Sequence, residues 1–183
     1  MNIPNGLTLA RIALAPVLIL ALASHHRDIA LAVFCAGMAT DVLDGHIART
    51  RGLVSDFGKL MDPAADKLLV GSAFVSLAAI DRLDAAIVVA ILSREIAVSA
   101  LRVVASRRGV VISASSLGKA KTGLQAVAVI ALMIVGNPDA AAMHLLVAAT
   151  TLVTILSGMA YFLSYLSAPV SGDRVAQSAS SPG

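Results

Sequence analysis

The stretch TDVLDGHIARTRGLVSDFGKLMDPAADK, residues 40–67, carries two closely spaced aspartate pairs, Asp41 with Asp44 and Asp62 with Asp66, inside a chain that is otherwise mostly apolar. An α-helix turns by about 100° per residue, so Asp41 and Asp44 fall about 60° apart on one helix. By the same geometry Asp62 and Asp66 fall about 40° apart on a second helix. The polar segment between the two pairs is long enough to reverse the chain. We therefore expect four carboxylates to share one small pocket.

Four carboxylates in one pocket need positive charge close by. Two unit charges about 4 Å apart repel by about 4 kcal/mol at an effective dielectric constant of about 20. Arg49, Lys59 and Lys67 could supply part of the positive charge as a buried ion-pair network. Two divalent cations balance four carboxylates better, and Mg²⁺ or Mn²⁺ suits a set of oxygen ligands that stays open to phosphate. The pattern predicts a site with two metal ions that binds a phosphate ester.

The composition predicts an all-α integral membrane protein. Of the 183 residues, 58% are hydrophobic and 14% are charged, whereas about a quarter of the residues of a soluble domain are charged. At about 20 residues per span there is room for about six transmembrane helices. We place these helices at about residues 12–24, 29–50, 57–80, 85–106, 118–136 and 140–166, and the first of them starts at about residue 7 if Leu7 and Leu9 are counted. Residues 1–11 are expected to lie along the interface, residues 1–167 to form one membrane domain, and residues 168–183 to form a disordered tail.

A signal peptide is the alternative interpretation of the first apolar run. The sequence Ala21-Leu22-Ala23 before Ser24 resembles a cleavage site with small residues. However, no Lys or Arg precedes the run, and Arg11 interrupts it. These two features favour a transmembrane span over a signal peptide.

The distribution of basic residues predicts the orientation. If the amino terminus is cytoplasmic, eleven of the 14 Lys and Arg residues fall on the cytoplasmic side, Arg27 and Arg82 fall outside, and Arg94 lies in mid-span. The positive-inside rule then places both aspartate pairs at the cytoplasmic end. Basic residues scattered at helix ends, with only 3% aromatic residues, do not form a nucleic-acid-binding surface. We expect no nucleic acid partner.

Some residues inside the apolar spans are expected to have structural roles. Cys35 lies alone in an apolar run and is expected to be a small core residue. Arg94 and Glu95 are adjacent, so their side chains leave the helix about 100° apart. We expect each of them to bond another helix rather than to pair with the other. Contact with a substrate is the alternative for both.

The four aspartates belong to a longer motif, Asp41-x2-Asp44-Gly45-x2-Ala48-Arg49-x8-Gly58-x3-Asp62-x3-Asp66. This motif resembles the signature of the CDP-alcohol phosphotransferase family, and every defined position is matched. Further blocks resemble bacterial phosphatidylglycerophosphate synthases, a branch of that family. They include NIPN near the amino terminus, the Arg94-Glu95 pair and GKAKTGLQ at residues 118–125. The resemblance therefore covers residues 2–125.

The resemblance implies transfer of a phosphatidyl group from CDP-diacylglycerol to sn-glycerol 3-phosphate, with release of CMP. It implies a multi-pass protein of the bacterial inner membrane, active at the cytoplasmic face, and a possible homodimer. By the same resemblance, Asp41, Asp44 and Asp62 bind metal, and Asp66 binds metal and acts as the general base. The residues expected to contact the nucleotide are Asp41, Asp44, Gly45, Ala48, Arg49, Gly58 and Asp62.

The phosphate of the acceptor needs cations from outside the aspartate cluster. Lys119 and Lys121 at the start of the fifth predicted span, and Arg102 at the inner end of the fourth, are placed to bind it. Ordinary positive-inside charge is the alternative explanation for these three residues. A related enzyme that uses serine, an inositol phosphate or phosphatidylglycerol as acceptor is the nearest alternative function. A divalent-cation transporter is the alternative from another class, although transporter sites usually lie at the membrane midplane.

Overall fold

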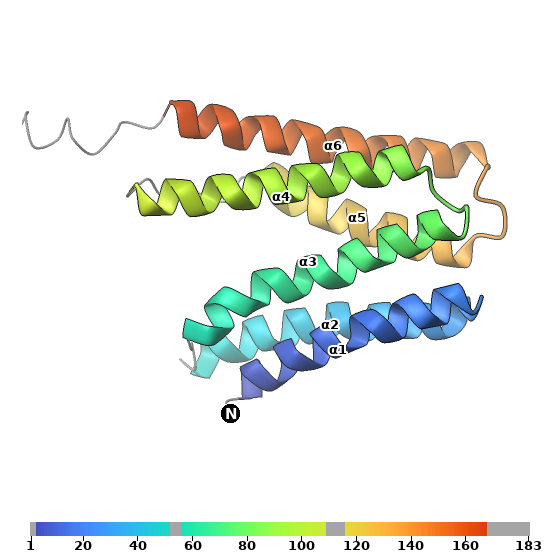
Figure 1. Cartoon of the computed structure of the whole chain (residues 1–183), viewed down its shortest axis with the longest axis horizontal. Helices are drawn as coiled ribbons and strands as arrows, with labels where there is room; N and C mark the ends of the chain where they lie inside the picture. Colours follow the sequence, from blue (N-terminus) through green and yellow to red (C-terminus); the bar gives the residue numbers. More distant parts are fainter. Residues whose placement is uncertain (1–2, 52–55, 109–115, 168–183) are drawn as a thin grey trace, which may run out of the picture.

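The computed structural model describes residues 3–51, 56–108 and 116–167, without the side chains of residues 3–5, 44–51, 56–60, 62–63, 116 and 119. Within these ranges every regular element is a helix, and Figure 1 shows the helices running roughly side by side along one long axis. The helices are α1 (Ile3–Ala23), α2 (Arg27–Arg51), α3 (Asp56–Ala79), α4 (Ala85–Arg107), α5 (Ser116–Ile134) and α6 (Ala141–Leu166). The prediction of an all-α protein with six helices is confirmed, and five helices match their predicted bounds within two residues.

The first helix differs from its prediction. Residues 3–11, expected to form a separate interfacial segment, are continuous with α1. Pro4 lies in the first turn of α1. The N–H groups of a first turn have no acceptor within the helix, so a proline there removes no hydrogen bond and does not break the helix. Thr8 and Arg11 are fully buried, so this part of α1 packs against the bundle.

Short turns with local hydrogen bonds close the helices at the end of the bundle that lies to the right in Figure 1. His25 and Asp81 follow α1 and α3 with φ of 59° and 58°. After α1, the N–H of His26 donates to Ala21 O at 2.9 Å, and after α3 the N–H of Arg82 donates to Leu77 O at 2.9 Å. A residue with positive φ, followed by a residue whose N–H donates to the carbonyl five positions earlier, forms the Schellman motif. This motif supplies hydrogen-bond donors to the last carbonyls of a helix.

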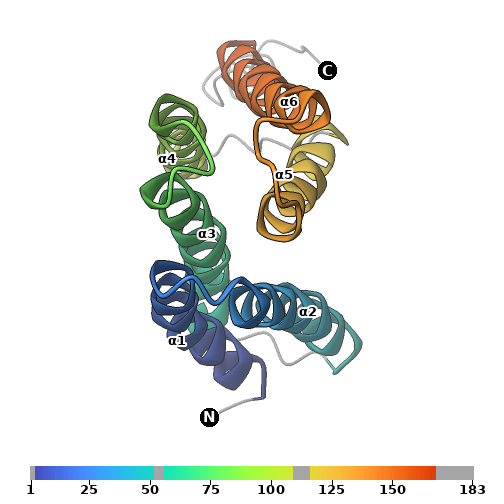
Figure 2. The same ribbon diagram turned by 90° about the vertical axis from the view of Figure 1, so that its right-hand side faces the viewer.

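The helices form two groups of three. α1 packs extensively on α2 and α3, and α6 packs on α4 and α5, while fewer contacts join the two groups. Figure 2, which looks along the bundle, shows α1 and α2 at the bottom, α3 above them with α4 next to it on the left, and α5 beside α6 on the right. One apolar core nevertheless runs through both groups. It includes Leu18 of α1, Phe34 of α2, Leu69 of α3 and Val129 of α5, all fully buried.

Arg82, in the turn between α3 and α4, connects the two groups at this closed end. Its Nε donates to the carbonyl oxygen of Leu132 at 2.7 Å, and its Nη2 donates to the carbonyl oxygen of Val135. Leu132 lies in the last turn of α5 and Val135 directly follows the helix, in the region where a helix leaves its last carbonyls without intrahelical partners. Arg82 therefore caps α5 from a distant turn.

Among the described residues, two helices are by length and composition long and apolar enough to cross a membrane: α1, over Gly6–Ala23, and α6, over Ala141–Leu166. Cys35 of α2 is exposed, so the prediction that it is a core residue is wrong. An apolar stretch of sequence does not imply burial in a protein whose outer surface is itself apolar.

Candidate active site

Two of the four motif aspartates have side chains that the structure describes, Asp41 on α2 and Asp66 on α3. Both are half-buried, and they lie close enough to interact electrostatically. One member of each predicted pair is therefore close to a member of the other pair, while the shared pocket of four carboxylates stays a prediction. The side chains of the remaining predicted motif residues lie outside the described part of the chain, and these are Asp44, Gly45, Ala48, Arg49, Gly58 and Asp62.

Arg11 of α1 contacts the aspartate cluster. Its side chain is 0% exposed, and its Nη1 lies 2.9 Å from Oδ1 of Asp41. It also interacts electrostatically with Asp66. The sequence alone assigned Arg11 no role at the site. The signal that points to a role is the cost of burying an arginine in an apolar helix, which by default marks a functional or paired group.

The two described aspartates suit a divalent metal ion. They supply carboxylate oxygens from neighbouring helices, the donor type that Mg²⁺ and Mn²⁺ prefer, and their mutual repulsion is the kind that a bound cation relieves. Among the residues with described side chains, no group of three or more Asp, Glu, His or Cys is close enough to hold a metal. The predicted ligands Asp44 and Asp62 lie outside that set.

A polar cavity of about 480 Å³ adjoins Asp66. Four helices contribute to it, and its charged and hydrogen-bonding side chains are Asp66, Lys67, Arg94, Glu95, Ser99, Arg102, Lys121, Thr122 and Tyr161. The cavity thus brings Arg102 and Lys121, both predicted to bind the acceptor, to the motif residue Asp66. The side chain of Lys119, the third predicted residue, lies outside the described part.

Glu95 accepts hydrogen bonds from two cations in this cavity. Lys121 Nζ lies 2.6 Å from its Oε1, and Arg94 Nη1 lies 2.9 Å from the same atom. The prediction that adjacent Arg94 and Glu95 do not pair is therefore wrong, because their long side chains bend together after leaving the helix in different directions. The prediction that each bonds another helix is confirmed, since Arg94 Nη2 also donates to Ser157 Oγ on α6 at 2.7 Å.

The remaining two cations of the cavity are held by hydroxyl groups. Lys67 donates from Nζ to Ser99 Oγ. Arg102 donates from Nη2 to the hydroxyl of Tyr161, and its Cζ lies 4.8 Å from the centre of the tyrosine ring. Tyr161 on α6 is 3% exposed, so this end of the cavity is closed by a buried aromatic residue.

Sequence reasoning did not include Ser157 and Tyr161, because no motif extends to α6. One signal was available. Thr150, Thr154, Ser157 and Tyr161 recur at intervals of three and four residues, which puts them on one face of a helix. A polar face along an apolar helix indicates a surface that other helices or a ligand cover.

The charges of the cavity favour an anion. Among its described lining residues, four side chains are cationic and two, Asp66 and Glu95, are anionic. The surplus of two positive charges matches a phosphate monoester, which carries nearly two negative charges. Arg and Lys are the side chains that bind phosphate most strongly.

Comparison with known proteins agrees with this geometry. The CDP-alcohol phosphatidyltransferase family matches this chain over residues 1–165, which includes all of α1–α5 and nearly all of α6. The chain belongs to this family. The match favours a transferase over the divalent-cation transporter that the aspartate cluster alone allowed.

Curated relatives cover most of the chain. A probable phosphatidylglycerophosphate synthase of Mycobacterium tuberculosis (strain H37Rv) is 41% identical over 167 residues, which are 87% of this chain and 79% of that protein. The CDP-diacylglycerol--glycerol-3-phosphate 3-phosphatidyltransferase of Bacillus subtilis (strain 168) is 42% identical over 152 residues, 75% of this chain and 79% of that protein. The protein of the same name from Rickettsia felis is 37% identical over 170 residues, 88% of this chain and 93% of its own length.

Proposed function

We propose that this protein is an enzyme of phospholipid biosynthesis that transfers the phosphatidyl group of CDP-diacylglycerol to the primary hydroxyl of sn-glycerol 3-phosphate, giving phosphatidylglycerophosphate and CMP. The observation that carries this proposal is the polar cavity, where the motif residue Asp66 shares one space with cations from α3, α4 and α5. An acceptor that bears a phosphate monoester fits that surplus of positive charge. The names of the relatives from Bacillus subtilis and Rickettsia felis support the same reaction.

In the proposed reaction, the acceptor hydroxyl oxygen attacks the phosphorus atom that carries the diacylglycerol. The bond from that phosphorus to the CMP oxygen breaks, and CMP leaves with its electron pair. Asp66 accepts the hydroxyl proton as general base. The cavity cations hold the acceptor phosphate and so keep the hydroxyl near Asp66. Divalent ions bound by the four motif aspartates would neutralise the pyrophosphate and the charge that develops on it.

The nucleotide is proposed to lie along the motif on the other side of the aspartates from the acceptor. The proposed contacts include the small residues Gly45 and Ala48 on α2 and Gly58 on α3, together with Arg49. Residues without bulky side chains let a nucleotide approach the helix backbone closely. Arg11 supports this part of the site, because its buried guanidinium orients Asp41.

We further propose that all six helices cross the membrane, as one domain of residues 1–167 with the active site at the cytoplasmic face and residues 168–183 as a tail. Large apolar side chains are exposed on every helix, as a lipid-facing surface requires. Examples from α1 to α6 are Leu20, Val42, Val75, Ile96, Val127 and Leu163. The excess of basic residues at the active-site end supports the orientation. A homodimer, which the family resemblance implies, stays a prediction.

The test is an acceptor panel with the purified protein in detergent, CDP-diacylglycerol and Mg²⁺, with CMP release as the readout. We expect release with sn-glycerol 3-phosphate at least about tenfold faster than with serine, an inositol phosphate or phosphatidylglycerol. Chelation of the metal should stop release, and titration with Mg²⁺ or Mn²⁺ should restore it. Preference for another acceptor would replace the proposed substrate, and no CMP release with any acceptor would overturn the proposal.

A further inference from the structure

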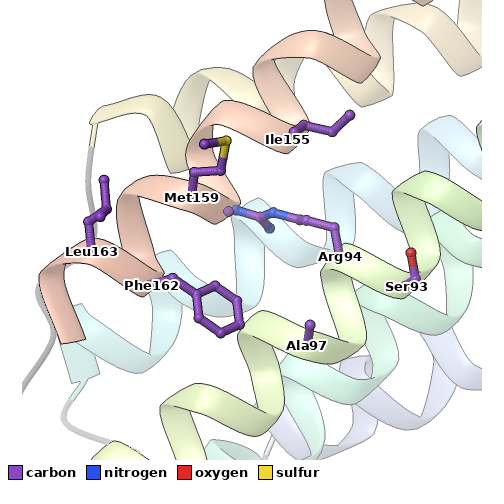
Figure 3. A pocket seen from close by; sticks show the side chains of 8 residues that line it. Ser93, Arg94, Ala97, Ile155, Met159, Phe162 and Leu163 are labelled. Carbon is purple, nitrogen blue, oxygen red and sulfur yellow. The ribbon is translucent and has the colours of Figure 1, made fainter. Parts of the chain in front are cut away.

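The apolar helix α6 holds both arginines of the cavity. Arg94 is held by Ser157 at 2.7 Å, and Arg102 is held by Tyr161. Both α6 residues are buried, with 0% and 3% exposure. In Figure 3 the Arg94 side chain extends from α4 to α6 and ends beside Met159. The positions of both guanidinium groups therefore depend on side chains of α6.

Gly158 of α6 shows that the helix is shaped around these arginines. A Cβ atom at Gly158 would lie 2.9 Å from Cγ and 3.1 Å from Nε of Arg94. Only a glycine lets the stem of Arg94 lie this close to the α6 backbone. Within residues 157–161, the hydroxyls of Ser157 and Tyr161 thus accept hydrogen bonds from arginines of α4, and Gly158 leaves room for the side chain of Arg94.

The contact between Tyr161 and Arg102 has two parts. The tyrosine hydroxyl accepts a hydrogen bond from Nη2, and the guanidinium carbon lies 4.8 Å from the ring centre, within the range of a cation–π interaction. Arg102 itself is exposed, and a free exposed arginine samples many rotamers. Fixing such a side chain during binding costs part of the affinity, which a preorganised side chain keeps.

We propose that Tyr161 is a positioning residue for the acceptor phosphate: it holds the Arg102 guanidinium in the cavity and thereby sets the affinity for sn-glycerol 3-phosphate. This inference rests on the proposed function, in which Arg102 binds that phosphate. It gives this role to a residue of α6, which lies beyond the last sequence block, residues 118–125, that predicted a site residue. The expected consequence is an effect on acceptor affinity that is absent for the lipid substrate.

The chain offers a matched control four residues further along α6. Tyr165 accepts a hydrogen bond from Arg108 Nη1 at 2.8 Å, but neither residue lines the cavity. Tyr161→Phe and Tyr165→Phe therefore remove the same atom from the same kind of contact on the same helix. Only the first removal affects an arginine of the cavity.

The experiment measures CMP release while each substrate is varied at saturation of the other. For Tyr161→Phe we expect the KM for sn-glycerol 3-phosphate to rise about three- to tenfold, with kcat and the KM for CDP-diacylglycerol changed by less than about twofold. Tyr161→Leu, which also removes the aromatic ring, should raise that KM further. Tyr165→Phe should resemble the wild type. Unchanged acceptor KM in Tyr161→Phe, or an equal rise of both KM values, would overturn the proposal.

A double variant tests whether Tyr161 acts through Arg102. If it does, Arg102→Ala/Tyr161→Phe should show the same acceptor KM as Arg102→Ala alone, because the positioned group is already absent. Additive effects would mean that Tyr161 acts by another route. Thermal unfolding of each variant in detergent shows whether the fold is kept.

Binding of inorganic phosphate separates this proposal from the proposed function. Titration of phosphate, followed by protection against thermal unfolding, needs no turnover and no lipid. Saturable protection in the wild type that weakens about three- to tenfold in Tyr161→Phe supports the role of Tyr161 even if another acceptor proves to be the substrate. Equal protection in both proteins, or none in the wild type, overturns it.

Discussion

The two groups of helices build their parts of the site in different ways. In α1–α3 the predicted functional residues come from one motif of 26 positions, 41–66, and Arg11 adds one contact from α1. In α4–α6 the residues are scattered, with Arg102, Lys121 and Tyr161 on three different helices. The first group presents carboxylates at fixed spacing, whereas the second assembles cations and hydroxyls from distant parts of the chain.

The difference fits what each group is proposed to bind. A metal site needs oxygen donors at defined distances, which restricts both the residue types and their spacing. A phosphate monoester can be bound by any long cation that reaches it, so the positions of those cations along the chain are less restricted. The first half of the site is therefore visible as a motif, whereas in the second half the contacts of Arg102 with Tyr161 and of Arg94 with Ser157 become visible only in three dimensions.

Asp66→Asn should have the largest effect, because Asp66 lies where the two halves meet. The side-chain amide of Asn has the same shape as the carboxylate of Asp66 but cannot accept the proton of the acceptor hydroxyl. The rate of CMP release should therefore fall by about 10²- to 10⁴-fold. Binding of CDP-diacylglycerol should stay measurable by titration. Asp81→Asn makes the same chemical change in a turn at the other end of the bundle and should release CMP at the wild-type rate. Turnover of Asp66→Asn near the wild type would rule out the general-base role.

Arg82→Gln tests whether the two groups depend on each other away from the site. It removes the charged donor to Leu132 O and Val135 O, and hydrogen bonds from charged groups contribute about 1.5–3 kcal/mol. We expect a stability loss of that size by denaturant unfolding in detergent, with CMP release per folded molecule within about twofold of the wild type. If the Arg82→Gln protein is folded but inactive, the contact of Arg82 with the end of α5 also positions the active site.

Lys121→Ala tests the second group alone. Lys121 contacts Glu95 at 2.6 Å and lines the cavity, so its loss should lower the positive charge there and raise the acceptor KM about tenfold. The KM for CDP-diacylglycerol should change less. Arg107→Ala removes an exposed basic residue from the end of α4, outside the cavity, and serves as the control. An unchanged acceptor KM would mean that Lys121 only balances the charge of Glu95.

The helices could be predicted because hydrophobic runs and polar turns alternate along the chain. Turn residues such as His25 and Asp81, whose φ values are positive, separate the runs clearly. The start of α1 was placed too late, because Pro4 and Gly6 suggest an irregular segment by composition. Burial of Arg11 against Asp41 is a tertiary contact, and single-sequence periodicity cannot show it.

The site could be predicted where its residues are close in sequence. The approach of Asp41 and Asp66 was predicted from helical spacing, and the presence of Arg102 and Lys121 in one cavity was predicted from their positions at helix ends. The pairing of Arg94 with Glu95 was not, because the direction in which a side chain leaves a helix does not fix where a long side chain ends. Tyr161 was missed because its partner, Arg102, lies 59 residues away.

Two buried glycines give the most direct comparison of the two groups. A Cβ at Gly37 of α2 would overlap Leu69 Cδ2, and a Cβ at Gly158 of α6 would lie 2.9 Å from Arg94 Cγ. Gly37→Ala should cost about 1–3 kcal/mol of stability through overpacking, with the acceptor KM unchanged. Gly158→Ala should displace Arg94 from Ser157 and raise the acceptor KM about threefold. If the two variants changed the acceptor KM equally, the proposed difference between the two groups of helices would be contradicted.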